Sequence, residues 1–192
     1  GWGGMAMYLA EVTDVQVLGV TLSTEQQALA TERAKARGLH NKVRFELLDY
    51  RKAQGPFDRI VSVGMYEHVG VSQQQEFFAQ VRDLLAPDGV ALIHTIGRMG
   101  GPGAISPWFR KYIFPGAHVP AVSEFAAAAE SAKLWITDIE ILRRHYADTL
   151  NHWEPRFQQQ RARAEALFDA RFCRMWEFDL IACEIGFRYG KQ

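Results

Sequence analysis

The fold is decided by VQVLGVTLSTEQ, residues 15–26. The first half of this stretch, Val15–Val20, is short, apolar and rich in valine, which predicts a strand. Ser23 is a predicted N-cap of the helix that follows, with Gln26 placed three residues later as in a capping box. Gly38 suits the end of that helix, because glycine adopts the left-handed C′ conformation without a steric penalty. A strand that leads directly into a helix is the building unit of an α/β fold.

The alternation of strand and helix continues downstream. Strands are predicted at Val43–Leu48, Asp58–Val63 and Val90–Ile96. The helix between the last two has one apolar face, and Ser72 is expected to cap it. Strands and helices that alternate in this way form βαβ units with right-handed crossovers. The sequence therefore predicts a doubly wound α/β fold with a parallel sheet covered on both faces.

The pattern changes after Gly97. Residues 98–120 combine glycines and prolines with interleaved aromatic side chains, which predicts an insertion that acts as a lid, reaching to about residue 135. Beyond residue 120 we expect a short Ala-rich helix over 121–132, a strand at Leu134–Leu142, and two helices that fill about 146–187.

Composition narrows the class of protein. A chain of 192 residues suits a single domain with a sizeable core. The 22 basic and 22 acidic side chains balance, which argues against a nucleic-acid binder that works through a strongly basic surface. Cys173 and Cys183 fall in an apolar helical pattern, so a reduced, intracellular protein is expected rather than a metal site. No signal peptide or membrane-spanning run is visible.

Two groups of residues are candidates for binding a nucleotide-like cofactor. GWGG at residues 1–4 precedes a predicted helix, and glycines there let backbone amides approach a ligand. Thr21–Gln26 follows a strand at the position where doubly wound folds bind nucleotides, and Asp49 with Tyr50 follows the next strand. Taken alone, the glycines are typical of a plain turn, Ser23 and Gln26 of a helix cap, and the Asp49 segment of a solvated loop.

Three further residues are candidates for catalysis. Glu67 follows one predicted strand and His94 ends the next, and the carboxyl ends of these consecutive strands should meet at one crevice. An ionisable pair in that place suits proton handling or anion binding, although a histidine at a strand end is often a core residue. Tyr146 is expected just before a helix that Asp148 or Thr149 caps, which by itself indicates only structure.

An ordered set of motifs covers nearly the whole chain and resembles one family. The motifs are GWGG, GVTLSTEQ, DYR, FDRIVSVGMYEHVG, LIHTIG, KYIFPG, HYADTL, RFCRMW and the late Cys183. Together they resemble the cyclopropane-fatty-acyl-phospholipid synthases and are similar to the mycolic acid cyclopropane synthases. The EHVG and HTIG blocks are the most specific of the set.

The resemblance implies a Rossmann-like class I methyltransferase fold with an insertion after the fifth strand. On that analogy residues 1–192 form the catalytic domain, truncated at the N-terminus and lacking the family's first and last strands. The family transfers the methyl group of S-adenosylmethionine to a cis double bond of a phospholipid acyl chain. A carbocation then loses a proton as the ring closes, and a bound bicarbonate ion is the expected base.

The resemblance also assigns site residues and partners. Glu67, His94, the backbone at Ile96, and Tyr146 would hold the bicarbonate. The S-adenosylmethionine contacts would be Gly1, Gly3, Thr21, Leu22, Ser23, Gln26, Asp49 and Tyr50. The implied partners are phospholipid acyl chains at a membrane surface and no nucleic acid. A homodimer stays open, and the expected location is cytoplasmic with peripheral membrane association.

Several alternatives remain open at this stage. A neutral chain needs a local patch to hold a membrane, for which Arg110 and Lys111 are candidates, but these side chains are equally typical of a solvated loop. Electron-rich walls for a carbocation could come from Tyr66, Trp108 or Phe114. An S-adenosylmethionine-dependent C-methyltransferase without ring closure would use the same fold, and a pseudoenzyme or a non-catalytic fragment would keep it without activity.

Overall fold

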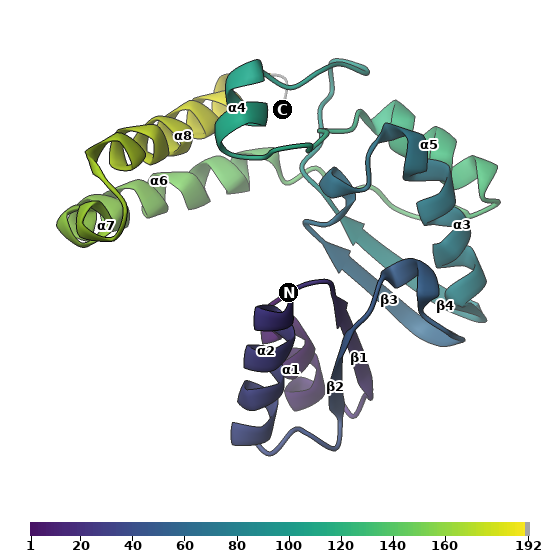
Figure 1. The fold of residues 1–192 in the computed structure, drawn as a ribbon. Coiled ribbons are helices and arrows are strands. Elements are labelled where there is room, and N and C mark those ends of the chain that lie inside the picture. Colours follow the sequence, from purple (N-terminus) through teal and green to yellow (C-terminus); the bar gives the residue numbers. More distant parts are fainter. Residues whose placement is uncertain (191–192) are drawn as a thin grey trace. The chain divides into compact units, whose positions relative to one another are not determined.

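The computed structural model describes residues 1–190, in two compact units that divide after Pro56 (Figure 1). The first unit contains α1 (Gly4–Val12), β1 (Val17–Thr21), α2 (Thr24–Ala36), β2 (Val43–Leu47) and the short 3-10 helix η1 (Tyr50–Lys52). β1 and β2 pair in parallel from Val17 opposite Val43 to Thr21 opposite Leu47. The core under them is formed by Met7, Ala10, Ala34 and Val43. The predicted strands, helix and parallel pairing are confirmed in this unit.

The junction of β1 and α2 differs from the prediction in one detail. Ser23 is the N-cap, and its Oγ accepts a hydrogen bond from the amide of Gln26 at 3.1 Å. The Gln26 side chain does not complete the capping box, because its Oε1 accepts from Thr21 Oγ1 at 2.7 Å. Thr21 Oγ1 in turn accepts from the Ser23 amide at 3.2 Å. Gly38 has φ +70°, as predicted for a C′ residue.

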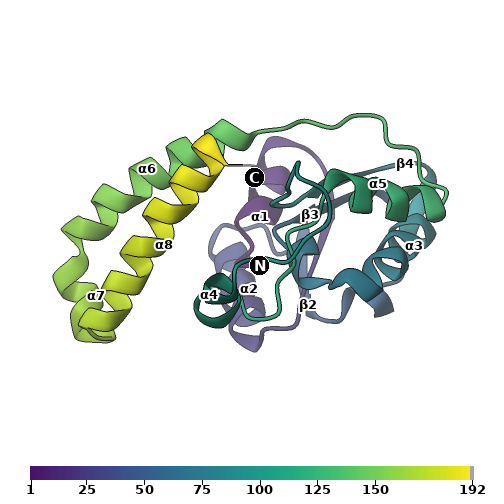
Figure 2. The same cartoon turned by 90° about the horizontal axis from the view of Figure 1, so that it is seen from above.

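The second unit, from Phe57 on, places a parallel strand pair beside helices and adds a helical hairpin (Figure 2). Its elements are β3 (Phe57–Val63), the 3-10 helices η2 (Tyr66–His68) and η3 (Val71–Gln73), α3 (Gln74–Leu84), β4 (Leu85–His94), α4 (Pro107–Tyr112), α5 (Val122–Ser131), α6 (Arg143–Gln159), α7 (Arg161–Leu167) and α8 (Ala170–Tyr189). β3 and β4 are parallel, with Val63 opposite His94 at their ends. Among the described residues the four strands therefore form two parallel pairs, one in each unit.

An aromatic cluster fills the space between η2, α3 and α5. Tyr66 is 1% exposed, and its ring lies 5.1 Å from Phe77 and 5.5 Å from Phe125, measured between centroids. Phe78 packs edge-on against Phe77 and Phe125 at 5.3 and 4.8 Å. The apolar helical spacing of α3 thus fixes the turn that carries Tyr66 and its neighbour Glu67.

Three boundaries in this region were predicted wrongly. Ser72 lies inside η3 and does not cap α3, whose N-cap residue is Gln73. β4 begins at Leu85 rather than Val90 and ends at His94 rather than Ile96. The early start reflects pairing of Leu85 with Phe57, followed by a register shift before Val90 pairs with Arg59.

The segment predicted as an insertion is mostly irregular and is closed at its base. The amide of Arg98 donates to the carbonyl of Pro120 at 2.9 Å, and Arg98 forms an isolated parallel bridge with Ala121. Between these ends the only helix is α4, which Ser106 caps by accepting from the Trp108 amide at 3.3 Å. The Ala-rich helix predicted over 121–132 is α5.

The C-terminal part departs furthest from the prediction. Leu134–Leu142 forms no strand, because no described strand pairs with it, and Trp135 is 94% exposed. Three helices, α6 to α8, stand where two were expected. α6 begins at Arg143, so Tyr146 lies inside it and neither Asp148 nor Thr149 caps it.

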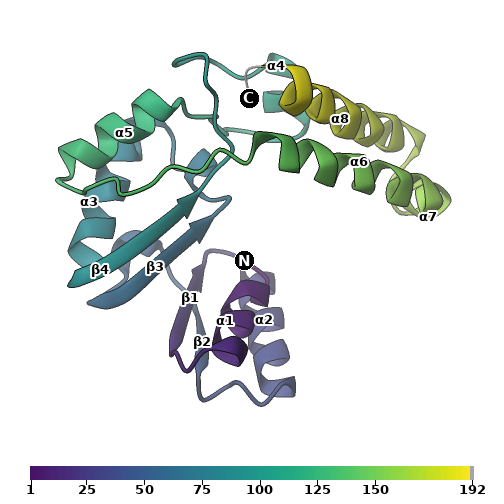
Figure 3. The ribbon, with the colours of Figure 1, turned by 180° about the vertical axis from the view of Figure 1, so that it is seen from behind.

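α6 and α8 lie side by side as a helical hairpin (Figures 1 and 3). Ala147 and Leu150 of α6 pack against Leu180 and Phe187 of α8, with Ile96 at the edge of this core. Within residues 1–190, no helix is both long enough and apolar enough to cross a lipid bilayer.

Candidate functional site

The cofactor residues predicted from the sequence gather in the first unit. The amide of Leu48 donates to the carbonyl of Thr21 at 3.0 Å, so the carboxyl ends of β1 and β2 lie side by side. This hydrogen bond brings the Thr21–Gln26 turn close to Asp49. Leu22, at the tip of the turn, is 76% exposed and free to contact a ligand. In doubly wound folds this edge of the sheet is where ligands bind.

Asp49 is held as an ionised acceptor. Its Oδ1 caps η1 by accepting from the Arg51 amide at 3.0 Å, and its Oδ2 pairs with Arg51 Nη2 at 2.5 Å. These hydrogen bonds from Arg51 lower the pKa of Asp49 to about 2. Arg51 Nε also donates to Oδ1 at 3.0 Å and to Oδ2 at 3.2 Å, so Arg51 already uses the four or so lone-pair positions of this carboxylate. A ligand that donates to Asp49 would have to share or displace one of these hydrogen bonds. The Arg51 guanidinium also lies 6.0 Å from the ring centroid of Tyr50.

The two glycines of the opening loop have different surroundings. Gly3 is buried as the N-cap of α1, with φ +84°. A Cβ at Gly3 would lie 2.8 Å from Ala30 Cβ and 2.9 Å from Phe45 Cζ, so the packing of α1 on the strand pair itself requires glycine. A Cβ at Gly1 would meet no heavy atom within 4 Å.

Glu67 is the most unusual side chain of the second unit. It is 7% exposed, and its Oε1 accepts from the amide of Ile96 at 2.8 Å, whereas its buried Oε2 has no hydrogen-bond partner in the described chain. Its carbonyl accepts from the amide of His118, in the irregular segment before α5, at 2.8 Å. Buried carboxylate oxygens are rarely left unpaired, so the free oxygen marks a place where a ligand or water would donate.

Ile96 and Tyr146, which were predicted to hold bicarbonate together with Glu67, pack against the same hydrophobic core. Both pack against the cluster of Leu150 and Phe187, and the Tyr146 ring lies 4.9 Å from that of Phe187. Burial raises the pKa of Tyr146, and the nearby charges of Cys183, Asp179 and Glu67 raise it further. The phenol therefore stays a hydrogen-bond donor at neutral pH. The backbone N–H of Ile96 is already donated to Glu67, so a ligand there would have to share it.

His94 is the last residue of β4, opposite Val63, so it lies at a strand end as expected, although the strand was predicted to continue to Ile96. Its carbonyl accepts from the Gly64 amide at 3.1 Å, but its imidazole is exposed and makes no hydrogen bond or ion pair within residues 1–190. The reading of His94 as a core residue is therefore wrong. The ring is accessible to a ligand.

Sequence reasoning missed one ionisable residue. Asp179 is 6% exposed on α8, where Cys183 Sγ donates to its Oδ1 at 3.5 Å. Burial raises the pKa of Asp179, and burial with the Asp179 charge raises that of the Cys183 thiol to about 12. The signal was present in the sequence, because Asp179 stands between Trp176 and Cys183 on the apolar stripe of this helix.

Tyr66, which was expected as an electron-rich wall for a carbocation, does not line an open pocket. Tyr66 is enclosed by the aromatic cluster, with no partner for its hydroxyl in the described chain, and burial raises its pKa. It supports the turn that carries Glu67 and is not an open wall. Trp108 is half-buried on α4, facing α8, and Phe114 is exposed beyond the end of that helix.

Known proteins with the same architecture define the class. The chain superposes on the crystal structure of mycolic acid cyclopropane synthase CmaA1 complexed with SAH and CTAB with a TM-score of 0.90 and 29% identity, over 100% of this chain and 72% of that one. The fold is thus that of class I S-adenosylmethionine-dependent methyltransferases, which confirms the predicted fold class.

The family follows from the sequence comparisons. The family model for mycolic acid cyclopropane synthetase matches residues 1–192, and the chain belongs to that family. It is 42% identical over 188 residues to the cyclopropane-fatty-acyl-phospholipid synthase of Escherichia coli strain K12, covering 98% of this chain and 48% of that protein. It is 40% identical over 198 residues to a probable fatty acid methyltransferase of Pseudomonas putida, covering 99% and 50%. The chain thus spans about half the length of these two relatives.

Proposed function

We propose that this chain carries the catalytic site of an enzyme that cyclopropanates phospholipid acyl chains, using S-adenosylmethionine and a bound bicarbonate. The observation that carries the proposal is the buried Glu67 carboxylate, with one oxygen held by Ile96 and the other unpaired, beside a core that contains Tyr146. The relative from Escherichia coli, named a cyclopropane-fatty-acyl-phospholipid synthase, supports the same activity.

The first unit offers groups that suit S-adenosylmethionine. Asp49 is ionised and can accept from an amino group, and Tyr50 beside it can pack on an adenine ring. Thr21 orients the Gln26 side chain through its hydroxyl, which leaves the Gln26 amide group to donate to a ribose hydroxyl. When bound, S-adenosylmethionine would supply an electrophilic methyl group. Placing that methyl against the alkene should provide much of the rate, because an alkene is a poor nucleophile.

The second unit offers groups that suit bicarbonate. The free Oε2 of Glu67 can accept from the hydroxyl of that ion, and Tyr146 and His94 can donate to its oxygens. Bound bicarbonate would supply a base for the proton that is lost on ring closure. Glu67 holds this site through its bond to the Ile96 backbone, and the packing of Tyr146 against Phe187 fixes the phenol.

A second candidate function is methyl transfer to a fatty acyl chain without ring closure. The relative from Pseudomonas putida, named a probable fatty acid methyltransferase, favours it. The cofactor residues would be the same in both reactions, and the fate of the double bond separates them. A pseudoenzyme would bind the cofactor and form neither product.

The substrate would be reached at a membrane surface by peripheral association, because an acyl chain has to leave its leaflet to meet the cofactor. In this proposal the protein handles no nucleic acid. The proposal does not depend on whether the protein forms a homodimer.

The experiment that tests the function is product analysis. The full-length protein is incubated with isotopically labelled S-adenosylmethionine and vesicles of a cis-monounsaturated phospholipid, with bicarbonate present or removed. We expect a labelled chain that has gained one CH2 group and resists ozonolysis. A labelled product that ozone still cleaves would replace the first candidate by the second. Binding of S-adenosylhomocysteine without any labelled product would indicate a pseudoenzyme.

A further inference from the structure

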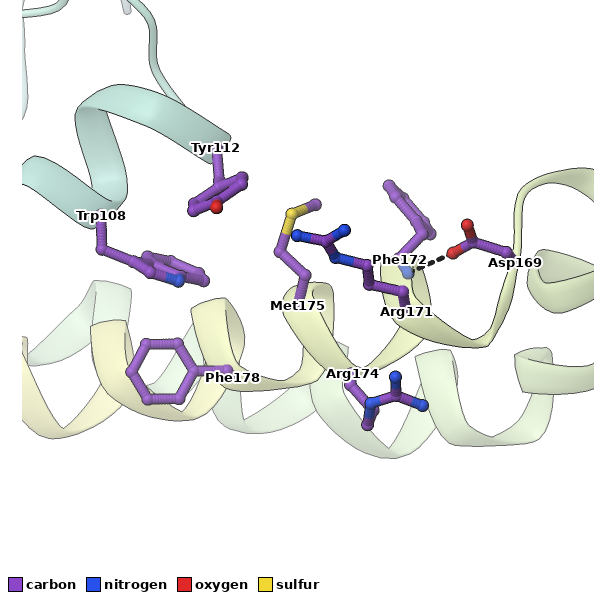
Figure 4. A pocket seen from close by; sticks show the side chains of 8 residues that line it. All are labelled: Trp108, Tyr112, Asp169, Arg171, Phe172, Arg174, Met175 and Phe178. Carbon is purple, nitrogen blue, oxygen red and sulfur yellow. Dashed lines mark hydrogen bonds between the residues drawn. The ribbon is translucent and has the colours of Figure 1, made fainter.

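A groove lies between α4 and α8 of the second unit. Neither Glu67 nor its hydrogen-bond partners line it. It is open to solvent, with a volume of about 620 Å³, and side chains from both helices line it (Figure 4). Trp108 and Tyr112 project from α4 toward α8, where Phe172, Met175 and Phe178 face them. The catalytic and cofactor proposals use none of these residues on α8.

The walls of the groove are aromatic and partly open. The ring of Trp108 lies 4.7 Å from that of Phe178, measured between centroids, and 5.7 Å from that of Tyr112. Phe178 nevertheless stays 53% exposed. The exposed apolar surface continues along α8 through Ile181 and Ile185. A connected apolar surface of this kind on a folded chain marks a site of interaction.

The charges of α8 are sorted by face. Glu177 bonds to Gln158 at 2.7 Å and to Arg161 at 3.0 Å, and Glu184 bonds to Asn151 at 3.2 Å and to Arg188 at 3.0 Å. Glu177 and Glu184 therefore form hydrogen bonds or ion pairs with side chains of α6, α7 and α8 itself. The third acidic side chain of α8, Asp179, is buried.

Cations outnumber acids on the groove side. Arg171 and Arg174 line the groove and have no carboxylate partner within residues 1–190. One acid, Asp169, also lines the groove, and its carboxylate caps α8 by accepting from the Phe172 amide at 2.6 Å. α4 adds Arg110 and Lys111, which line an adjoining hollow, and no acid.

We propose that this α4–α8 surface docks the protein onto a leaflet of anionic phospholipids. The arginines would contact headgroup phosphates, while the aromatic side chains enter the interface, where Trp and Tyr are favoured. A chain with zero formal net charge needs such a local concentration of cations to hold a membrane. The inference deepens the proposed function by naming the lipid-facing surface, and it rests on that function only for the nature of the lipid.

The test is co-sedimentation of the full-length protein with vesicles, without S-adenosylmethionine. One set contains phosphatidylcholine alone, and the other equal amounts of phosphatidylcholine and phosphatidylglycerol. We expect binding to the anionic set that weakens with salt. The double variant Arg171→Gln/Arg174→Gln should bind roughly 20- to 30-fold more weakly, since each basic residue near such a surface contributes about a factor of five. Arg144→Gln/Arg156→Gln on α6 makes the same change in charge on exposed side chains outside the groove and should bind like the unmodified protein.

A second measurement addresses the aromatic wall. Phospholipids brominated in the acyl chain should quench tryptophan fluorescence of the bound protein, and Trp108→Phe should remove most of that quenching. Equal loss of binding in both double variants, or unchanged quenching in Trp108→Phe, would overturn the proposal. So would a groove that proves to be covered by a second copy, detected as a dimer that the groove variant dissociates while vesicle binding is absent. Vesicle binding without methyl transfer would keep this inference and reject the proposed function.

Discussion

The amide of Ile96 donates to Oε1 of Glu67 at 2.8 Å, while Oε2 of the same carboxylate is buried without a partner in the described chain. Leaving a buried acceptor unpaired costs about 1–3 kcal/mol. A fold that holds one oxygen of this carboxylate in place and leaves the other free has a binding position built into it.

Replacing Glu67 by Gln should separate chemistry from cofactor binding. The variant keeps an acceptor for the Ile96 amide but loses the negative charge and one acceptor oxygen. We expect product formation to fall by roughly 10²- to 10⁴-fold, the usual contribution of a general base, because Glu67 would hold the bicarbonate that serves as the base. The affinity for S-adenosylhomocysteine, measured by isothermal titration, should change little, because the expected cofactor residues lie in the other unit. Glu165→Gln, on an exposed side chain of α7, is the control. Full product formation by the Glu67 variant would remove it from the mechanism.

Thr21→Val should weaken cofactor binding. The hydroxyl of Thr21 donates to Gln26 and accepts from the Ser23 amide, so its loss releases both sides of the turn that we propose to contact the cofactor. Loss of two such bonds should raise the dissociation constant of S-adenosylhomocysteine roughly tenfold. Thr31→Val is a matched control, because the Thr31 hydroxyl bonds only to the Gln27 carbonyl of its own helix. If both variants bind alike, the turn does not contact the cofactor.

Gly3→Ala should destabilise the first unit through packing as well as backbone strain. The new Cβ would lie too close to Ala30 and Phe45, in addition to the left-handed backbone at φ +84°. We expect the free energy of unfolding to fall by about 2–4 kcal/mol. Gly38→Ala shares the positive φ but meets no atom within 4 Å, so it should lose only about 1–2 kcal/mol. Urea titration of both variants measures the difference, and equal losses would contradict the packing argument.

Asp179→Asn should change how stability depends on pH. Burial raises the pKa of Asp179 above its ordinary value of 3.8, so the folded state binds this proton more tightly than the unfolded state. That contribution is fully present below pH 3.8 and is lost as the pH rises through the raised pKa. The asparagine carries no such proton. The difference in urea midpoint, variant minus unmodified protein, should therefore increase as the pH is raised from about 4 to about 7. Asp138→Asn, on an exposed side chain, should show a constant offset. A parallel pH profile for Asp179→Asn would contradict the argument.

The regular part of the fold was predictable from local patterns. Ser23 and Gly38 set the ends of α2 by side-chain capping and by backbone conformation, which depend on nearby residues alone. The strand at Leu134–Leu142 failed for the opposite reason. Alternating apolar residues form a strand only where another strand pairs with them, and in the described chain none does.

The sequence predicted which residues belong to the candidate site, but it did not predict how their side chains are arranged. Glu67 and His94 were placed correctly at the ends of adjacent strands, but their side chains have different environments, one buried and one exposed. The Glu67 side chain is buried where it accepts from the amide of Ile96, 29 residues further along the chain, and such a contact cannot be read from local patterns. Asp179 was missed because a carboxylate on an apolar stripe is buried only by the partner helix.

The sorting of charge on α8 has a consequence for how such a protein can diverge. Glu177 and Glu184 bond within the hairpin, so substitutions there disturb the fold itself. Arg171 and Arg174 make no such bonds within residues 1–190, and their number and sign can drift at little cost in stability. One helix thus carries one set of charges that is bonded into the hairpin and another set that can change in number and sign while the scaffold stays the same.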